Sequence, residues 1–341
     1  MFVRNAWYVA AWDHEVGQAL LARTLLGTPV VLFRTADGTP VALEDRCCHR
    51  HAPLSAGRLK GDTVECGYHG LRFDRTGACV EVPSQTLVPP GGRIASYPLI
   101  ERNRWLWIWM GDSQRADAAL IPDLFWHDSP KWKAVGGYNY VKGAYQRMID
   151  ITLDQTHSRY VHPNTLGSAD KVRFKPKLIR EGNALRCERK IPDSDPPPLW
   201  AKVAGITGNA DQWNIWRYIP PNVITFDVGI GPVGSGVLQG DRSKGFTGHN
   251  THGLTPETER TTHHFWVSAR NFALEDEALT KQFANLRNVF LEDVAMVEAV
   301  QRTVDAFPGA PSIDVGSDAP TIQARAMVDQ LLDTERSSRA A

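Results

Sequence analysis

Cysteine and histidine side chains gather between residues 47 and 79, a segment that holds four of the five cysteines in the chain. Thiolates and imidazoles are the ligands of zinc sites and of some iron–sulfur clusters. An odd cysteine count with this clustering argues against a disulfide framework. Two ligand sets fit the spacing, each with two thiolates and two imidazoles: Cys47-x-His49 with Cys66-x2-His69, or Cys48-x2-His51 with Cys66-x2-His69.

The turn residues around each pair favour the first set, although the second set would suit a tetrahedral zinc site. Ala52-Pro53-Leu54 follows the first pair, and Gly67 and Gly70 surround the second. Two such loops at the tip of a β-rich domain would hold a cluster from both sides. The other cysteine and histidine side chains are then expected to be structural, supporting or surface groups: Cys48, Cys79, Cys187 and His51.

A second group of side chains with metal-ligand chemistry lies near residue 150 and comprises Asp150, Asp154, His157 and His162. The first three recur at i, i+4 and i+7, which places them on one face of a helix. His157 and His162 are five residues apart, which is roughly 140° around an ideal helix. They face one metal only if the helix widens or ends between them. A polar helix with two hydrogen-bonded histidines is the alternative on spacing alone.

A third ligand is expected from the C-terminal half of the chain. Apolar residues there follow steps of three and four, as on the buried face of a helix: Leu279, Phe283, Leu286, Phe290, Val297 and Val300. Asp293 falls in the same stripe, and a carboxylate on an apolar face must be paired, protonated or metal-bound. Two histidines and one carboxylate form the facial triad of non-haem Fe(II) oxygenases. The alternative is a buried ion pair with an arginine, and Glu292, about 100° away, is expected to be solvated.

The elements that position these clusters follow from the local pattern. Strand and turn signals dominate the first 110 residues, among them the Asp37-Gly38 hairpin signal and the alternating strand Trp105–Trp109. We predict an all-β domain over residues 1–112, followed by a polar linker. An α+β domain over 113–341 follows, with helical patterns at 145–161 and 274–306, strands from about 185 to 270, and a frayed tail at 335–341.

Length and composition agree with two globular domains. The chain has 341 residues, of which 42% are hydrophobic and 22% charged. Its 38 basic and 38 acidic residues cancel, which argues against a nucleic-acid partner. No apolar run reaches the ~18 residues of a membrane span, and no signal peptide is recognisable. We therefore expect a cytoplasmic protein with no membrane partner.

With both clusters identified, the chain resembles a Rieske non-haem iron oxygenase of the type that includes vanillate O-demethylase, dicamba O-demethylase and toluenesulfonate methyl-monooxygenase. The likeness covers nearly the full length. The stretch from Cys47 to Asp74 is similar to the Rieske signature. Further matching segments are Asn5–Ala10, Met148–Asp150, Leu153–His162, His252–Glu259, Ala269–Phe272 and Glu292-Asp293.

The resemblance implies two cofactors on two domains. A Rieske [2Fe–2S] cluster would be held by Cys47, His49, Cys66 and His69. A mononuclear Fe(II) would be held by His157, His162 and Asp293, in a catalytic domain whose antiparallel sheet and helices have the helix-grip arrangement. The family also implies a ring-shaped homotrimer, in which Asp154 bridges His69 of one subunit to His157 of the next. Electrons would come from an NAD(P)H-dependent reductase with flavin and an iron–sulfur centre.

The reaction implied is oxidation of an aromatic acid or ether with O2, by O-demethylation or methyl hydroxylation. Angular or ring dioxygenation of a diaryl ether such as a phenoxybenzoate is the alternative within the family. A non-catalytic Rieske electron-transfer protein and a zinc-stabilised binding module are the alternatives from other classes. Substrate contacts are expected from the sheet, with His252 and Trp216 the first candidates, followed by His249, His263 and His264. Ile151 departs from the family, which often has Asn at this position.

Overall fold

The structure is a computed structural model that describes residues 1–340, with side chains described as far as residue 338. The chain forms two compact units, Met1–Asp123 with Thr255–Thr258, and Leu124–Leu254 with Glu259–Ala341. The predicted domain boundary at residue 112 lies before the observed boundary, which follows Asp123. The segment between the two boundaries stays with the first unit because the Trp7 indole donates a hydrogen bond of 2.8 Å to the carbonyl oxygen of Asp117.

The first unit consists of three small antiparallel sheets, so the predicted all-β character is confirmed. The expected hairpin forms around Asp37-Gly38, and the predicted strand at Trp105–Trp109 pairs with the N-terminal strand. The first sheet contains β1 (Trp7–Trp12), β11 (Trp105–Trp109) and β10 (Leu99–Arg102). The second contains β2 (Leu21–Leu25), β3 (Thr28–Arg34), β4 (Pro40–Glu44) and β9 (Ser96–Tyr97). The third contains β5 (Arg58–Lys60), β6 (Thr63–Glu65), β7 (Arg72–Phe73) and β8 (Cys79–Glu81).

The second unit is built on one sheet of seven strands, in the order β12-β18-β17-β16-β15-β14-β13. Strands β13 to β17 form an antiparallel run, and β12 pairs antiparallel with β18. Their bounds are β12 Lys133–Val141, β13 Lys177–Glu181, β14 Ala184–Ser194, β15 Ala210–Ile219, β16 Val223–Pro232, β17 Phe246–Thr258 and β18 Thr261–Arg270. The sheet forms because long alternating segments bury one face against helices.

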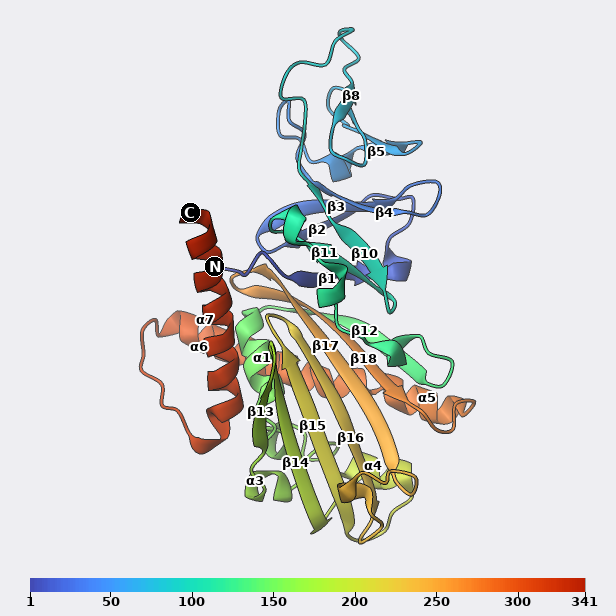
Figure 1. Ribbon diagram of the computed structural model, residues 1–341, viewed down its shortest axis with the longest axis vertical. Coiled ribbons are helices and arrows are strands. Elements are labelled where there is room, and N and C mark those ends of the chain that lie inside the picture. The colour runs from blue at the N-terminus through green and yellow to red at the C-terminus, as the bar shows by residue number, and fades with distance from the viewer. Residues whose placement is uncertain (341) are drawn as a thin grey trace. The chain divides into compact units, whose positions relative to one another are not determined.

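Helices cover one face of this sheet, and Figure 1 shows α5 and α6 crossing behind the strands. Phe290 of α6 contacts the ring of Trp266 at 5.1 Å between centroids, which joins the helix to β18. The helices are α1 Tyr145–Leu153, α2 Ser158–Val161, α3 Asp170–Arg173, α4 Pro198–Ala204, α5 Glu277–Ala284, α6 Leu286–Ala306 and α7 Ala319–Ala340. The predicted α+β character of this unit is confirmed.

Two predicted helices differ from those observed. The pattern at 145–161 breaks into α1 and α2, and the pattern at 274–306 divides into α5 and α6. Asp150 therefore does not share a helix face with Asp154 and His157. Its carboxylate pairs instead with Arg325 of α7, at 2.5 Å between Oδ2 and Nη2.

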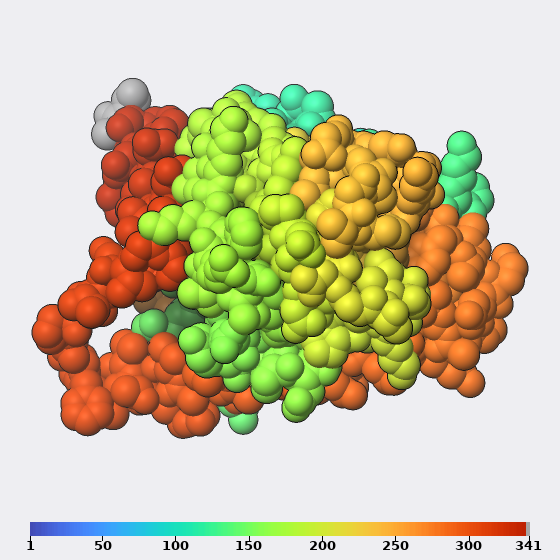
Figure 2. Space-filling model, turned by 90° about the horizontal axis from the view of Figure 1, so that it is seen from below, coloured from blue at the N-terminus to red at the C-terminus, as the bar shows by residue number. Residues whose placement is uncertain are grey.

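The prediction of a frayed C-terminal tail was wrong, because α7 continues to Ala340. Its inner face carries Ala324, Met327 and Val328, all buried. Because these three apolar residues stand among many charged ones, the amphipathic pattern of the helix is weak and is hard to recognise in the sequence. Residues 307–318, which join α6 to α7, form an exposed projecting loop, visible in orange-red at the side of Figure 2.

Among residues 1–340, no helix combines the length and the apolar composition that crossing a bilayer would require.

The buried face of α7 predicts a measurable contribution to stability. Replacing Met327 with Ala leaves a cavity under α7 and should lower the free energy of unfolding by about 2–4 kcal/mol. Urea denaturation monitored by circular dichroism measures this loss. Gln330→Ala, at an exposed position of the same helix, serves as the control and should change stability by less than about 0.5 kcal/mol. Equal stability of the two variants would contradict the docking of α7.

Candidate active site

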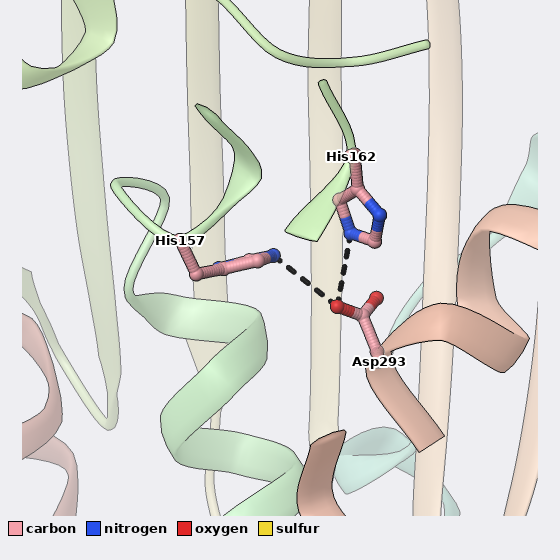
Figure 3. Close-up of side chains that lie close together, drawn as sticks. All are labelled: His157, His162 and Asp293. Atoms are coloured by element: carbon pink, nitrogen blue, oxygen red, sulfur yellow. Dashed lines mark hydrogen bonds and ion pairs between the residues drawn. The ribbon is translucent and has the colours of Figure 1, made fainter. Parts of the chain in front are cut away.

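Three of the predicted ligand side chains meet in the second unit. The ligand atoms of His157, His162 and Asp293 all lie within 4.8 Å of one another, and Figure 3 shows both imidazoles directed at one carboxylate. Oδ1 of Asp293 is 3.2 Å from Nε2 of His157 and 2.9 Å from Nε2 of His162. The alternative of an ion pair between Asp293 and an arginine is wrong, because its partners are these two histidines.

The two histidines converge because the chain leaves the helical conformation after α1 and resumes it only at α2. The Asp154 carboxylate accepts hydrogen bonds from the backbone N–H and the hydroxyl of Thr156, at 3.0 and 2.7 Å. Such a local side-chain contact competes with helix continuation. The chain resumes a single helical turn at Ser158, after which His162 leaves it with φ −121° and ψ 47°. The break removes the angular conflict that a continuous helix would impose.

The electrostatics of the triad suit a divalent cation. Burial disfavours the charged form of Asp293, but hydrogen bonds and charges from both histidines outweigh it and lower its pKa to about 2. Burial also opposes protonation of His162, while Asp293 and Glu292 raise its pKa above the usual 6.5. A half-buried carboxylate facing two imidazole nitrogens is the donor set of a non-haem iron site. The residues present therefore fit the metal.

The second ring nitrogen of each imidazole, Nδ1, also has a polar partner. Nδ1 of His157 contacts the backbone oxygen of Asp154, and Nδ1 of His162 lies 2.6 Å from Oε2 of Glu292. Glu292 is exposed, as expected, and its flexible side chain also reaches His162 from the neighbouring position on α6. Such contacts fix the ring orientation so that both Nε2 atoms face Asp293. No spacing rule in the sequence pointed to either contact.

An apolar cavity opens beside the triad. Its walls include Trp200, Phe226 and Phe290, together with the predicted substrate residue His252. Nδ1 of His252 lies 2.9 Å from Nε2 of His264. Burial lowers the pKa of His252 to about 4, so this imidazole is neutral near pH 7. A basic side chain that the sequence did not identify, Lys171, lines the same cavity.

The other predicted pocket residues lie elsewhere. Trp216 shares a face of β15 with Asn214, two residues away, but it lines a second cavity with Asp154 and Arg189 rather than the cavity of the triad. The remaining histidines make aromatic or polar contacts within the second unit. His249 stacks on Trp126 at 4.6 Å between centroids, and Nδ1 of His263 lies 2.8 Å from the hydroxyl oxygen of Tyr138. His264 does not line the triad cavity, but it contacts two residues that do, His252 and Phe290.

The cysteine–histidine cluster forms two matching loops in the first unit. The carbonyl oxygen of Cys47 accepts from the N–H of His51, and that of Cys66 accepts from Gly70, both at 3.0 Å. The N–H groups of Cys47 and Cys66 donate to Ala52 and Leu71, both at 2.8 Å. Each loop thus repeats the same pair of backbone hydrogen bonds around a cysteine. Equivalent geometry on both sides supports the ligand set that begins with Cys47.

The side chains of these loops fit an iron–sulfur cluster. Cys47 and Cys66 are buried in an apolar cluster with Phe73, whereas the imidazoles of His49 and His69 are exposed and 4.6 Å apart between centroids. Burial, followed by the nearby Cys66, raises the pKa of the Cys47 thiol to about 11. Two thiols in this setting ionise when a metal compensates their charge. All five cysteines are free thiols in the structure.

Comparison with protein families decides between the remaining interpretations. Residues 6–98 match the family described as the Rieske [2Fe-2S] domain. Residues 141–334 match the vanillate O-demethylase oxygenase C-terminal domain. The chain belongs to the Rieske oxygenases. It is therefore an oxidoreductase, and the zinc-stabilised binding module and the non-catalytic electron-transfer protein are set aside.

Curated relatives span the whole length of this Rieske oxygenase. The iron–sulfur subunit of the toluene-4-sulfonate monooxygenase system of Comamonas testosteroni is 44% identical, over 100% of both chains. The dicamba O-demethylase oxygenase component of Stenotrophomonas maltophilia is 37% identical over 88% of each. The vanillate O-demethylase oxygenase subunit of Pseudomonas sp. (strain HR199 / DSM 7063) is 33% identical, covering 98% of this chain and 96% of its own.

Solved structures of dicamba monooxygenase share the fold. The structure bound to dicamba superposes with a TM-score of 0.90 at 34% identity, covering 98% of this chain and 99% of the other. A second, described as containing non-heme iron and dicamba, has a TM-score of 0.85 at 32% identity, covering 99% of both. The predicted fold class and the predicted cofactors, a Rieske [2Fe–2S] cluster and a mononuclear iron, are thereby confirmed for this Rieske oxygenase. The residue assignments for each cofactor rest on the geometry above.

The loop geometry predicts which cysteine holds the cluster. Cys47→Ser should abolish the visible absorption of the Rieske centre, because it removes a thiolate from one of the two matching loops. Cys48→Ser changes the neighbouring, half-buried thiol and should retain the full spectrum. Absorption and iron–sulfide analysis of the two purified variants provide the measurement. The opposite result would assign the cluster to the alternative ligand set.

The triad predicts that the mononuclear iron can be lost while the Rieske cluster is retained. Asp293→Ala should eliminate mononuclear iron while the Rieske absorption is retained. Glu292→Gln should weaken iron affinity roughly 10–100-fold, because it alters the contact that orients His162. Iron titration of the chelator-treated protein, read against the intact cluster spectrum, measures both effects. Arg302→Ala, exposed on the same helix, is the control, and full iron retention by Asp293→Ala would refute the assignment.

Proposed function

We propose that this chain catalyses monooxygenation of a methyl or methoxy carbon on an aromatic acid or ether, as the oxygenase component of a multicomponent system. The supporting observation is the triad of His157, His162 and Asp293 at the wall of an apolar cavity with aromatic sides. Relatives named for toluene-4-sulfonate, vanillate and dicamba support the same substrate class. O2 and electrons from an NAD(P)H-dependent flavin and iron–sulfur reductase complete the reaction.

The residues of the chain supply binding, orientation and exclusion of water. Cys47, His49, Cys66 and His69 would hold the [2Fe–2S] cluster, and the triad would hold the mononuclear iron. The cluster supplies one-electron transfer and the iron supplies a site for oxygen activation. Aromatic side chains around the cavity, Trp200, Phe226 and Phe290, exclude water and present flat surfaces to an aromatic ring. Neutral His252 offers a polar contact without introducing a charge.

The atom balance distinguishes the two reactions of the family. Monooxygenation inserts one oxygen atom of O2 into a C–H bond, and two electrons and two protons convert the other atom to water. A hydroxylated methoxy group then collapses to a phenol and formaldehyde. Angular dioxygenation of a phenoxybenzoate, the second candidate, places both oxygen atoms in the product and releases no formaldehyde.

A turnover screen with a Rieske-oxygenase reductase tests the proposal. Methoxybenzoates, methylarylsulfonates and phenoxybenzoates are supplied with NADH and O2, and formaldehyde, hydroxylated product and O2 uptake are measured. We expect formaldehyde from the methoxybenzoates, a hydroxymethyl product from the methylarylsulfonates, or both, with one O2 consumed per product. Turnover confined to phenoxybenzoates, without formaldehyde, would favour dioxygenation, and coupled oxidation of none of them would overturn the proposal.

We also propose that Asp154 carries electrons between subunits of a homotrimer, as the resemblance implies. Its carboxylate is held by Thr156, and its backbone oxygen contacts the ring of His157, so it is directly connected to the triad. Asp154→Asn should retain both metal centres and lose most turnover with every accepted substrate. Asp150→Asn, which alters the neighbouring carboxylate on α1, is the matched control. Near-normal turnover of Asp154→Asn would contradict the role.

A homotrimer, a cytoplasmic location and the absence of nucleic-acid and membrane partners complete the proposal. Zero net charge supports the absence of a nucleic-acid partner, and the lack of an apolar run long enough to span a membrane supports the absence of a membrane partner. Sedimentation of the purified protein measures the oligomeric state.

A further inference from the structure

Lys171 is a buried cation in the wall of the cavity that contains the triad. It lies on α3, and its side chain is more than nine-tenths buried. The ammonium group donates to the carbonyl oxygen of Leu166 at 2.9 Å and to the hydroxyl oxygen of Ser158 at 3.4 Å. An ammonium has three donors, so one N–H has no partner among residues 1–338. A buried charge without full hydrogen bonding is costly and calls for a compensating group.

The surroundings of Lys171 hold no carboxylate that pairs with it. Among the residues that line the triad cavity, Asp293 is the one acidic side chain. Its carboxylate already pairs with both histidines of the triad. Lys171 also forms none of the ion pairs found in the described part of the chain. Burial, reinforced by the charge of Arg189, lowers the pKa of Lys171 to about 7. Near pH 7 about half of the Lys171 side chains are therefore protonated, and a bound anion would favour this charged form.

A second buried cation adds to the positive potential. Arg189 is 3% exposed, and its Nε and Nη1 atoms have no hydrogen-bond partner. Its guanidinium lies over the ring of Trp216 at 5.2 Å. The adjoining cavity is lined by Arg189, Lys171 and the exposed Lys175, with Asp154 as its one acidic side chain, so basic groups outnumber carboxylates there. Since Lys171 lines both cavities, the excess positive charge lies at the side of the triad cavity where its ammonium group sits.

We propose that the ammonium group of Lys171 binds the sulfonate or carboxylate of an aromatic anion, whose ring lies between the aromatic walls of the triad cavity. This inference rests on the proposed function and narrows its substrate class to aromatic anions. The free N–H of Lys171 and the excess positive charge both select a negatively charged group. The apolar walls, Phe226 and Phe290 among them, select the ring.

Binding to the holoenzyme without reductant tests the subsite separately from turnover. The probes are two charged and uncharged pairs: toluene-4-sulfonate with toluene-4-sulfonamide, and 4-methoxybenzoate with 4-methoxybenzamide. Calorimetric titration of the wild-type protein should show at least one anion bound roughly tenfold or more tightly than its uncharged counterpart. Equal or tighter binding of both uncharged probes, or no binding of either anion, would overturn the proposal.

Variants assign the preference to Lys171. Lys171→Met should weaken binding of the preferred anion about tenfold or more, and change binding of its uncharged counterpart less than about twofold. Lys171→Arg, which keeps the charge, should retain most of the preference, and the exposed Lys177→Met should leave it unchanged. The cluster spectrum and iron content establish that each variant is folded. If Lys171→Met loses both probes equally, the lysine is structural and the inference fails.

The outcomes separate this inference from the proposed function. Selective anion binding without oxidation of any aromatic compound would support the subsite and reject the proposed reaction. Oxidation of aromatic ethers with no difference between charged and uncharged substrates would support the reaction and reject the subsite. Should Lys171→Met fail to load metal, Lys171→Gln, an uncharged polar side chain of similar length, takes its place, and an unchanged preference for the anion in that variant would reject the inference.

Discussion

The catalytic unit depends on one half-buried carboxylate that is held between two imidazoles. Asp293 lies on the apolar stripe of α6, where an ionised group would be costly without partners. Its partners come from a chain segment about 130 residues earlier, which must break its helix to present them. The sheet, the crossing of α6 over it and the interruption between α1 and α2 all bring these groups together. The ionised carboxylate between two imidazoles favours a positive charge at this point, which a divalent cation supplies.

The two metal centres are built by different means. The cluster loops are local structures, in which matching backbone hydrogen bonds form around Cys47 and Cys66, and a histidine follows each cysteine by two or three residues. Short sequence spacing is enough to define such loops. The iron site is assembled by tertiary packing, because Asp293 approaches His157 and His162 only when α6 lies against the sheet. The same division explains why the first site has a compact signature and the second is dispersed along the chain.

Few ionisable side chains determine the charge inside the triad cavity. His252 and His264 contact each other, and burial lowers the pKa of both, so they contribute polarity without charge at neutral pH. Lys171 provides a cation and aromatic side chains provide the walls. The chain as a whole has zero formal net charge, yet basic side chains outnumber carboxylates in the adjoining cavity that Lys171 also lines. Overall composition therefore says little about the charge of the ligand that such a cavity selects.

The sequence by itself determined the features that depend on neighbouring residues: the all-β first unit, the cluster motif, the two-histidine segment and the apolar stripe that contains Asp293. It misjudged features that depend on distant partners. The break in the helix expected through Val161 is the exception, because it is local: Asp154 contacts Thr156, two residues later. The expected tail is instead the last part of α7, whose earlier turns bury Met327 and Val328. Glu292 near His162, and Lys171 in the cavity wall, were decided by tertiary structure alone. Local periodicity reports which face of a segment is buried, but only the packed chain determines which groups meet across it.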